Sequence, residues 1–140
     1  MIRGFTLLLV AGMLLCPIVG SHAEESVSLP KFKSVSVHDP SIIRTDDGVY
    51  YIYGSHMTCA KSTDLMNWEF ISKDAKGGCT LVENVQEQMK EALSYAKTDT
   101  FWAPDVQQLR DGRYAMYYCT CEGSSPLSTL GLAISDSPEG

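Results

Sequence analysis

The sequence predicts an all-β fold of the propeller type, because one hairpin pattern occurs twice. Asp39 is followed by a short β-branched stretch, an Asp-Asp-Gly turn and an alternating aromatic stretch that ends at Gly54. The same order returns at Asp105, with an Asp-Gly turn and a strand-like stretch through Tyr118. The two aspartates are 66 positions apart (105 minus 39), and each stands five positions before an arginine. A repeated β unit of this kind indicates blades around an axis.

The repeat also predicts a site. The first strand of each propeller blade lines the central channel, so equivalent positions on successive blades face one another. Asp39 and Asp105 are therefore expected to converge on one small space. Paired carboxylates are the groups that hydrolysis of a glycosidic bond requires, since one activates water and another protonates the leaving oxygen.

Two motifs carry a family resemblance. His38-Asp39-Pro40-Ser41 and the run Phe-Trp-Ala-Pro-Asp-Val at 101–106 together resemble glycoside hydrolase family 43, most closely its secreted endo-α-1,5-L-arabinanases. The resemblance extends from about Val37 to the last residue. It implies a five-bladed β-propeller, of which this chain holds about the first two blades plus a helical insertion. Because a blade takes roughly 40–45 residues, we expect 37–140 to be the N-terminal part of a longer catalytic domain.

The resemblance also implies roles for individual residues in an inverting hydrolysis. Asp39 is expected to be the general base, and Asp105 to raise the pKa of the acid and orient it. His38 and Trp102 are expected to contact the sugar, the latter by stacking. The general acid is a glutamate of a later blade; none of the glutamates here stands in the matching motif, and Glu122 is the one that merits a test.

No metal site is expected within this chain. Some arabinanases of the family hold calcium or another ion in the channel, so calcium is an expectation for the full-length protein. The ligands implied by the resemblance lie further along than residue 140.

The N-terminal region predicts export. Residues 1–23 have a basic start, an apolar run and small residues before a cleavage point after Ala23, which is typical of a secretory signal peptide. Residues 24–36 form a lead-in, and the alternation at 31–37 predicts an edge strand. We expect the protein to be secreted, outside the cell or in the periplasm, and free of the membrane once the signal is removed.

The net charge of the chain restricts the classes of molecule that it is expected to bind. Without residues 1–23 the chain has 17 acidic and 10 basic side chains, a formal charge of −7 (10 minus 17). No basic stripe for nucleic acid or acidic lipid is present. A neutral plant cell-wall polysaccharide, arabinan or arabinoxylan, is the expected partner.

Other elements follow from periodicity. Outer strands of the first blade are predicted at 57–60 and 68–71, and an amphipathic helix of about four turns over 82–97. His56 follows the strand that ends at Gly54, and a histidine that points back toward the channel and a loop histidine stay open as alternatives. Four cysteines remain after the signal; disulfides and buried thiols stay open as alternatives, and a zinc site lacks partners. They are Cys59, Cys79, Cys119 and Cys121.

Two alternative functions stay open. One is an α-L-arabinofuranosidase or β-xylosidase of the same family, because the loops that decide between endo and exo action are mostly absent. The other is a non-catalytic carbohydrate-binding propeller that uses Trp102 and the tyrosines for stacking. This second alternative needs no general acid.

Overall fold

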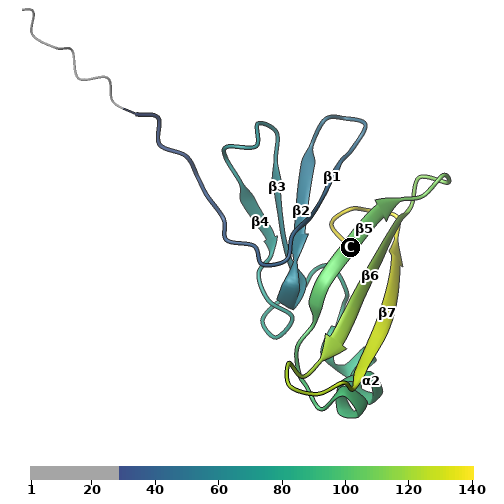
Figure 1. The fold of residues 1–140 in the computed structure, drawn as a ribbon. Helices are drawn as coiled ribbons and strands as arrows, with labels where there is room; N and C mark the ends of the chain where they lie inside the picture. The colour runs from purple at the N-terminus through teal and green to yellow at the C-terminus, as the bar shows by residue number, and fades with distance from the viewer. Residues whose placement is uncertain (1–28) are drawn as a thin grey trace, which may run out of the picture. The chain divides into compact units, whose positions relative to one another are not determined.

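The computed structural model describes residues 29–140, within which Lys31–Gly140 form one compact unit. The strands of this unit make two antiparallel sheets (Figure 1). The first sheet has the order β1 (Ser41–Arg44), β2 (Tyr50–Gly54), β3 (Thr58–Ser62) and β4 (Glu69–Ser72). The second sheet has the order β5 (Trp102–Gln108), β6 (Tyr114–Cys121) and β7 (Ser128–Ser135). The expectation of an all-β chain with two successive hairpin-based units is confirmed.

The first hairpin forms where the sequence predicts it. β1 and β2 pair in antiparallel register from Ser41 opposite Tyr53 to Arg44 opposite Tyr50. The turn between them places Gly48 at a φ of 89°, a left-handed conformation that glycine adopts at little cost. Asp39 therefore lies at the open end of the hairpin, away from the turn.

The second hairpin differs in one respect. The sequence places Asp105 ahead of a strand, whereas β5 already begins at Trp102 and contains the aspartate. The β5–β6 ladder is irregular between Trp102 and Asp105, where Ala103 has a φ of 42°. Such an irregularity turns side chains and releases backbone groups from the ladder. Periodicity alone does not reveal it.

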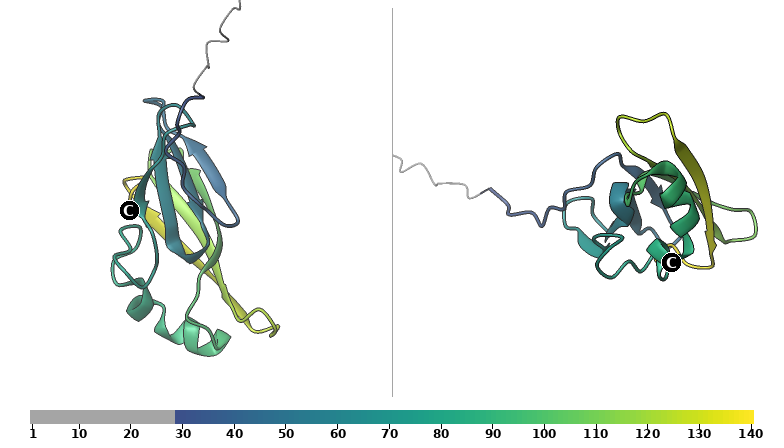
Figure 2. Two further views of the ribbon diagram at one scale, coloured as in Figure 1. Left: turned by 90° about the vertical axis from the view of Figure 1, so that its left-hand side faces the viewer. Right: turned by 90° about the horizontal axis from the view of Figure 1, so that it is seen from below.

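The prediction of a single helix of about four turns was wrong about its length. The structure has two shorter helices, α1 (Val85–Gln88) and α2 (Lys90–Ala96), which are separated at Met89. The periodicity nevertheless located the buried face, since Val85 and Leu93 are both buried. Short helices depend on tertiary packing more than on propensity, so a regular apolar pattern does not guarantee an unbroken helix. α2 packs against β6 and β7 (Figure 2).

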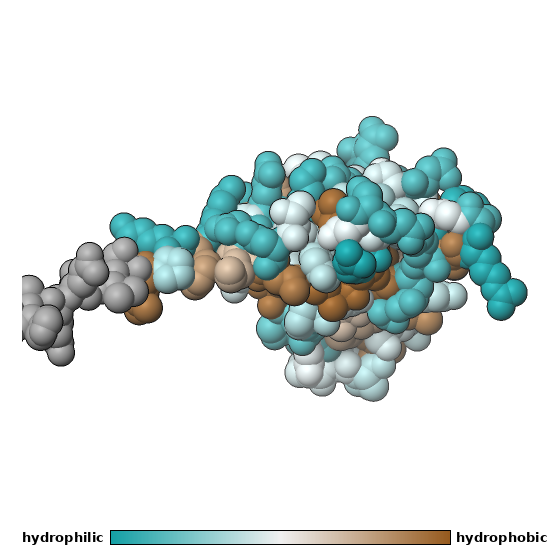
Figure 3. All heavy atoms as spheres, turned by 90° about the horizontal axis from the view of Figure 1, so that it is seen from above, coloured by the Kyte–Doolittle hydropathy of each residue, from teal (hydrophilic) through white to brown (hydrophobic). Residues whose placement is uncertain are grey.

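The core lies between the two sheets. Buried aromatic and apolar side chains from β2 and β3 pack in one cluster with those from β5 and β6. Seen from above, hydrophobic atoms gather along the middle of the drawn face between hydrophilic ones (Figure 3). The largest fully buried members are Tyr53, Phe101 and Met57, each at most 2% exposed. Burial of such side chains is the main favourable contribution to folding.

The N-terminal segment has no strand. Residues 29–37 are without ladder pairing, so the predicted edge strand at 31–37 is wrong. The segment instead attaches at single points: Trp68 N–H donates to the carbonyl of Lys33, at 2.8 Å. The predicted signal peptide 1–23 and the first part of the lead-in 24–36 lie outside the described residues. Within the described part of the chain, no helix has the length and apolarity to cross a membrane.

Candidate active site

Asp39 stands on a tightly constrained turn ahead of β1. Its φ is 49°, a left-handed conformation that aspartate tolerates better than most residues. The preceding carbonyl, that of His38, accepts a 2.9 Å hydrogen bond from Ser55 N–H. Gly54 lies beneath this turn, where a Cβ would come within 2.5 Å of the same carbonyl oxygen. The backbone around Asp39 is thus held from below by the end of β2.

The carboxylate of Asp39 is open to solvent on one side, with 42% of its side chain exposed. Its Oδ2 accepts a 2.8 Å hydrogen bond from Ser55 Oγ. The Nδ1 atom of His38 lies 3.1 Å from the same oxygen. One oxygen is therefore used for positioning, and the other has no hydrogen-bond partner among residues 29–140.

Asp105 is held in a similar way. Its Oδ1 accepts a 3.0 Å hydrogen bond from Ser41 Oγ, and Val106 N–H donates to that hydroxyl at 3.3 Å. Ser41 begins β1, two residues after Asp39. Ser41 thus joins the start of β1 to Asp105 and Val106 of β5.

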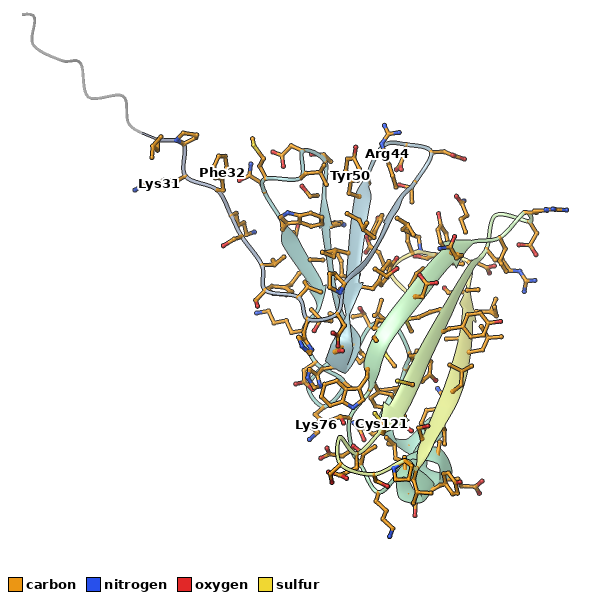
Figure 4. All side chains as sticks on the ribbon, in the orientation of Figure 1. Lys31, Phe32, Arg44, Tyr50, Lys76 and Cys121 are labelled. Carbon is orange, nitrogen blue, oxygen red and sulfur yellow. The ribbon has the colours of Figure 1, made fainter. Side chains whose placement is uncertain are left out.

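Trp102 begins β5, directly before Ala103, whose N–H donates to Ser55 Oγ. Its Nε1–H donates to the carbonyl of Cys121 at 3.0 Å, which fixes the indole plane against the end of β6. The ring centroid lies 5.1 Å from that of His56 and 6.2 Å from that of His38. His56, for which the sequence left two alternatives open, is thus part of an aromatic group with Trp102. Figure 4 marks the two ends of the sheets: Arg44 and Tyr50 flank the turn of the first hairpin, and Cys121 ends β6 at the opposite end.

Both hydroxyls at this site belong to residues that the sequence did not single out. Ser41 is part of the His-Asp-Pro-Ser motif and Ser55 follows Gly54, so both were visible. Serine is common in turns and strand ends, however, and its type does not reveal a distant partner. Only the packing of the two sheets identifies these hydroxyls as contacts of carboxylates.

The glutamates near the site are engaged elsewhere. Glu122 Oε2 accepts hydrogen bonds from Ser124 N–H and Oγ, at 3.1 and 2.6 Å, within its own loop. Glu139 accepts from Lys61 Nζ at 2.9 Å and from the hydroxyl of Tyr51 at 3.1 Å. In these positions, neither carboxyl is aimed at Asp39 or Asp105.

The cysteines in residues 29–140 are all free thiols in this structure. Cys59 is fully buried, and burial raises the pKa of its thiol to about 12. Burial also raises the pKa of Cys119, with smaller contributions from Cys121 and from the charge of Asp39. Cys119 Sγ lies 3.7 Å from the carbonyl oxygen of Trp102, so this thiol borders the candidate site.

The described residues do not provide a metal centre. Between residues 29 and 140, no three side chains of His, Cys, Asp or Glu are grouped to hold an ion. Calcium in the full-length protein stays an expectation, and no chemical step is assigned to it.

Comparisons with known proteins agree on one family. The model of glycosyl hydrolases family 43 matches residues 32–140. An extracellular endo-alpha-(1->5)-L-arabinanase of Bacillus subtilis is 50% identical over 111 residues, which are 79% of this chain and 24% of that protein. A family 43 glycoside hydrolase of Bacillus licheniformis superposes with a TM-score of 0.75 at 54% identity, over 80% of this chain and 25% of that structure. The endo-1,5-alpha-L-arabinanase of Thermotoga petrophila has a TM-score of 0.73 at 48% identity, over the same shares. This chain thus spans about a quarter of the length of each.

Proposed function

Because this chain belongs to glycosyl hydrolase family 43, we propose that the complete protein is an exported endo-α-1,5-L-arabinanase. The observation that carries the proposal is the link from Ser41, two residues after Asp39, to Asp105. The link keeps Asp105 of the second sheet beside the start of β1, two residues from Asp39, which supports the pair of carboxylates that glycoside hydrolysis requires. The names of the relatives at about half identity support arabinan as the substrate and an extracellular location.

Asp39 is the general base in this proposal. Its exposed carboxylate draws a proton from a water molecule, which attacks the anomeric carbon of an arabinofuranosyl residue. The bond to the leaving oxygen breaks on the opposite face, and the configuration inverts. In inverting enzymes the two working carboxyls stand roughly 6.5–9.5 Å apart, which leaves room for that water.

Asp105 acts through the general acid. A negative charge beside a carboxyl group favours its protonated form, so Asp105 keeps the acid ready to donate its proton. Neither Glu122 nor Glu139 is oriented for this role. The acid is then a glutamate of a later blade in the complete protein.

Trp102 and His38 form the substrate contact. The imidazole of His38 is exposed, with 68% of the side chain accessible, and the half-buried indole lies beside it. A furanose ring packs on such an aromatic face, and the imidazole offers a hydrogen bond to a sugar hydroxyl. Both groups lie at the end of the sheets where Asp39 is exposed.

The complete domain is a closed five-bladed propeller in this proposal. Support comes from the open face of the second sheet, where alternate residues of β7 are apolar and 45–73% exposed. Tyr117 of β6 adds to the same face at 49% exposure. An apolar sheet face of this kind is normally covered, as a neighbouring blade would do. The residues of β7 are Leu130, Leu132 and Ile134.

The test uses the complete reading frame and linear 1,5-α-arabinan. We expect internal cleavage with inversion by the complete protein, negligible turnover by residues 24–140 alone, and loss of turnover with Asp39→Ala. Since acid–base groups contribute roughly 10²–10⁴-fold, Asp39→Asn should lower kcat by that order with little change in arabinan affinity. Binding without hydrolysis by the complete wild type would instead identify a carbohydrate-binding propeller, and full activity of Asp39→Ala would remove the base assignment.

A further inference from the structure

We propose that Ser55 is the positioning residue of the base, and that Ser41 does the same for Asp105. This inference rests on the proposed function and extends it. Each hydroxyl connects an aspartate to a backbone N–H of β5. The two serines thereby set the geometry of the carboxylate pair without touching substrate.

Ser55 is held by hydrogen bonds at both its backbone N–H and its side-chain hydroxyl. The residue is 1% exposed, at the junction of β2 with the short helix η1 (Ser55–Met57). Its backbone N–H donates to the carbonyl of His38 at 2.9 Å. Its Oγ accepts from Ala103 N–H at 2.9 Å and lies 2.8 Å from Asp39 Oδ2. These contacts and its burial hold the side chain in one hydrogen-bonded arrangement.

The direction of each hydrogen bond follows from the inventory of donors. A backbone N–H can only donate, so the bond from Ala103 uses an acceptor site on Ser55 Oγ. The hydroxyl retains one proton, and the remaining partner is the carboxylate of Asp39. Ser55 is therefore a donor to that carboxylate, and a donor stabilises the ionised form that a general base needs.

This arrangement also distinguishes the two oxygens of Asp39. Oδ2 has both neighbours, Ser55 Oγ and His38 Nδ1. Oδ1 has no hydrogen-bond partner among residues 29–140. The geometry thus assigns Oδ1 as the atom that accepts the proton of the attacking water, while Oδ2 anchors the group.

Ser41 repeats the scheme for the second carboxylate. Val106 N–H donates to Ser41 Oγ, which leaves its proton for Asp105 Oδ1. The ladder irregularity in β5 explains why Ala103 N–H is free to reach Ser55. The positions of both aspartates are consequently set by the docking of β5 on the first sheet.

The matched control for Ser55 is Ser72. Its side chain is equally buried, at 1% exposure, and its Oγ donates to the carbonyl of Met57 at 2.7 Å. Either substitution removes a buried hydroxyl and its hydrogen bonding, but Ser72 contacts no carboxylate. Ser72→Ala should therefore reproduce the stability cost of Ser55→Ala without its catalytic effect.

The experiment measures pH–rate profiles of the complete enzyme on linear arabinan for Ser55→Ala, Ser55→Thr and Ser72→Ala. Among the described residues, the ionisable groups beside Asp39 are His38 in its own segment and Cys119 on β6, with Asp105 held on β5 through Ser41, and these are unchanged in all variants. Since hydrogen bonds to charged groups are the stronger class, Ser55→Ala should lower kcat roughly 10-fold or more with little change in KM. The acidic limb of kcat/KM should move to higher pH, because the ionised base has lost a donor. Ser55→Thr, which keeps the hydroxyl, should recover at least half of the lost rate.

Each outcome decides the matter. A shifted acidic limb in Ser55→Ala alone supports the assignment. An unshifted profile, or one that Ser72→Ala matches, overturns it even where Asp39→Ala is inactive and the proposed function stands. If Ser55→Ala does not fold, Ser41→Ala provides the same decision, with a lowered kcat expected and an unchanged kcat contradicting the scheme. Full activity of Asp39→Ala would instead mean that the proposed function itself fails.

Discussion

Ser41 Oγ of β1 lies 3.0 Å from Asp105 Oδ1 of β5, so the residue that begins one hairpin holds the aspartate of the other. The two residues are 64 positions apart in the chain. This hydrogen bond connects the two repeated hairpins of the sequence in three dimensions. Changes near either strand are therefore expected to affect both carboxylates.

Gly54→Ala should displace the base. A Cβ at this position meets the carbonyl oxygen of His38 at 2.5 Å, and backbone cannot yield as a side chain does. Overpacking of this kind costs roughly 1–3 kcal/mol, and here it also moves Asp39. We expect a lower Tm and a loss of arabinan hydrolysis in the complete protein. Gly123→Ala is the control, since its Cβ would meet nothing within 4 Å, and an active Gly54→Ala would contradict the described turn.

Trp102→Ala should weaken substrate binding. The indole stands beside two histidines and is fixed by its bond to the carbonyl of Cys121. Aromatic contacts contribute roughly 0.5–1.5 kcal/mol beyond their buried area, so KM for arabinan should rise roughly two- to tenfold. Trp68→Ala serves as the control, because that indole also donates to a carbonyl, that of Leu65 at 3.1 Å, but belongs to another surface. Equal KM values for both variants would exclude Trp102 as a sugar contact.

The ionised carboxyl of Glu139 should stabilise the fold near neutral pH and lose this effect at acidic pH. Its hydrogen bond with Lys61, aided by Tyr51, lowers the pKa of the carboxyl from its usual value of 4.5. A lowered folded pKa means that the stabilisation is present above about pH 4.5 and is lost as the pH falls through the folded value. The pair is more than one-third exposed, so Glu139→Gln should reduce the free energy of unfolding by less than about 1 kcal/mol at pH 7.

The same Glu139→Gln variant should differ less from wild type at pH 3 than at pH 7, because stabilisation by a carboxyl with a lowered folded pKa is lost progressively as the pH falls. Denaturant unfolding at the two pH values measures this difference. Glu87→Gln is the control, because its partner Lys90 lies 3.4 Å away and both side chains are over 70% exposed. A difference that persists unchanged at pH 3 would contradict the ionic contribution.

Cys59 should resist alkylation in the folded protein. Its side chain is fully buried, and its pKa of about 12 leaves almost no thiolate at pH 8. Iodoacetamide should modify the half-buried Cys79 and Cys121 first, and Cys59 only after denaturation. Peptide mass spectrometry of the labelled protein follows the order of modification. Early labelling of Cys59 would mean that the core between the sheets opens readily.

Local elements were largely predictable from residue order. The hairpin containing Tyr51 and Tyr53 follows from alternation, since both side chains face the core and both are buried. The turns at Gly48 and Gly112 follow from glycine, as each has a φ of 89°. Two elements were predicted wrongly. Residues 31–37 alternate between polar and apolar side chains but form no strand. The helical stretch is interrupted at Met89. Both depend on what packs against them.

The sequence by itself determined the family, the two hairpins and the repeat that singles out Asp39 and Asp105, because motifs and two-residue alternation are properties of neighbouring residues. Only the tertiary structure decided which groups hold those aspartates. The hydrogen bonds from these serine hydroxyls to the aspartates form because the two sheets dock. Ser55 meets Ala103 of β5, which is 48 positions later in the chain. Ser41 meets Asp105 of β5, which is 64 positions later. Hydrogen bonds across such separations depend on the docking geometry, which no local pattern encodes.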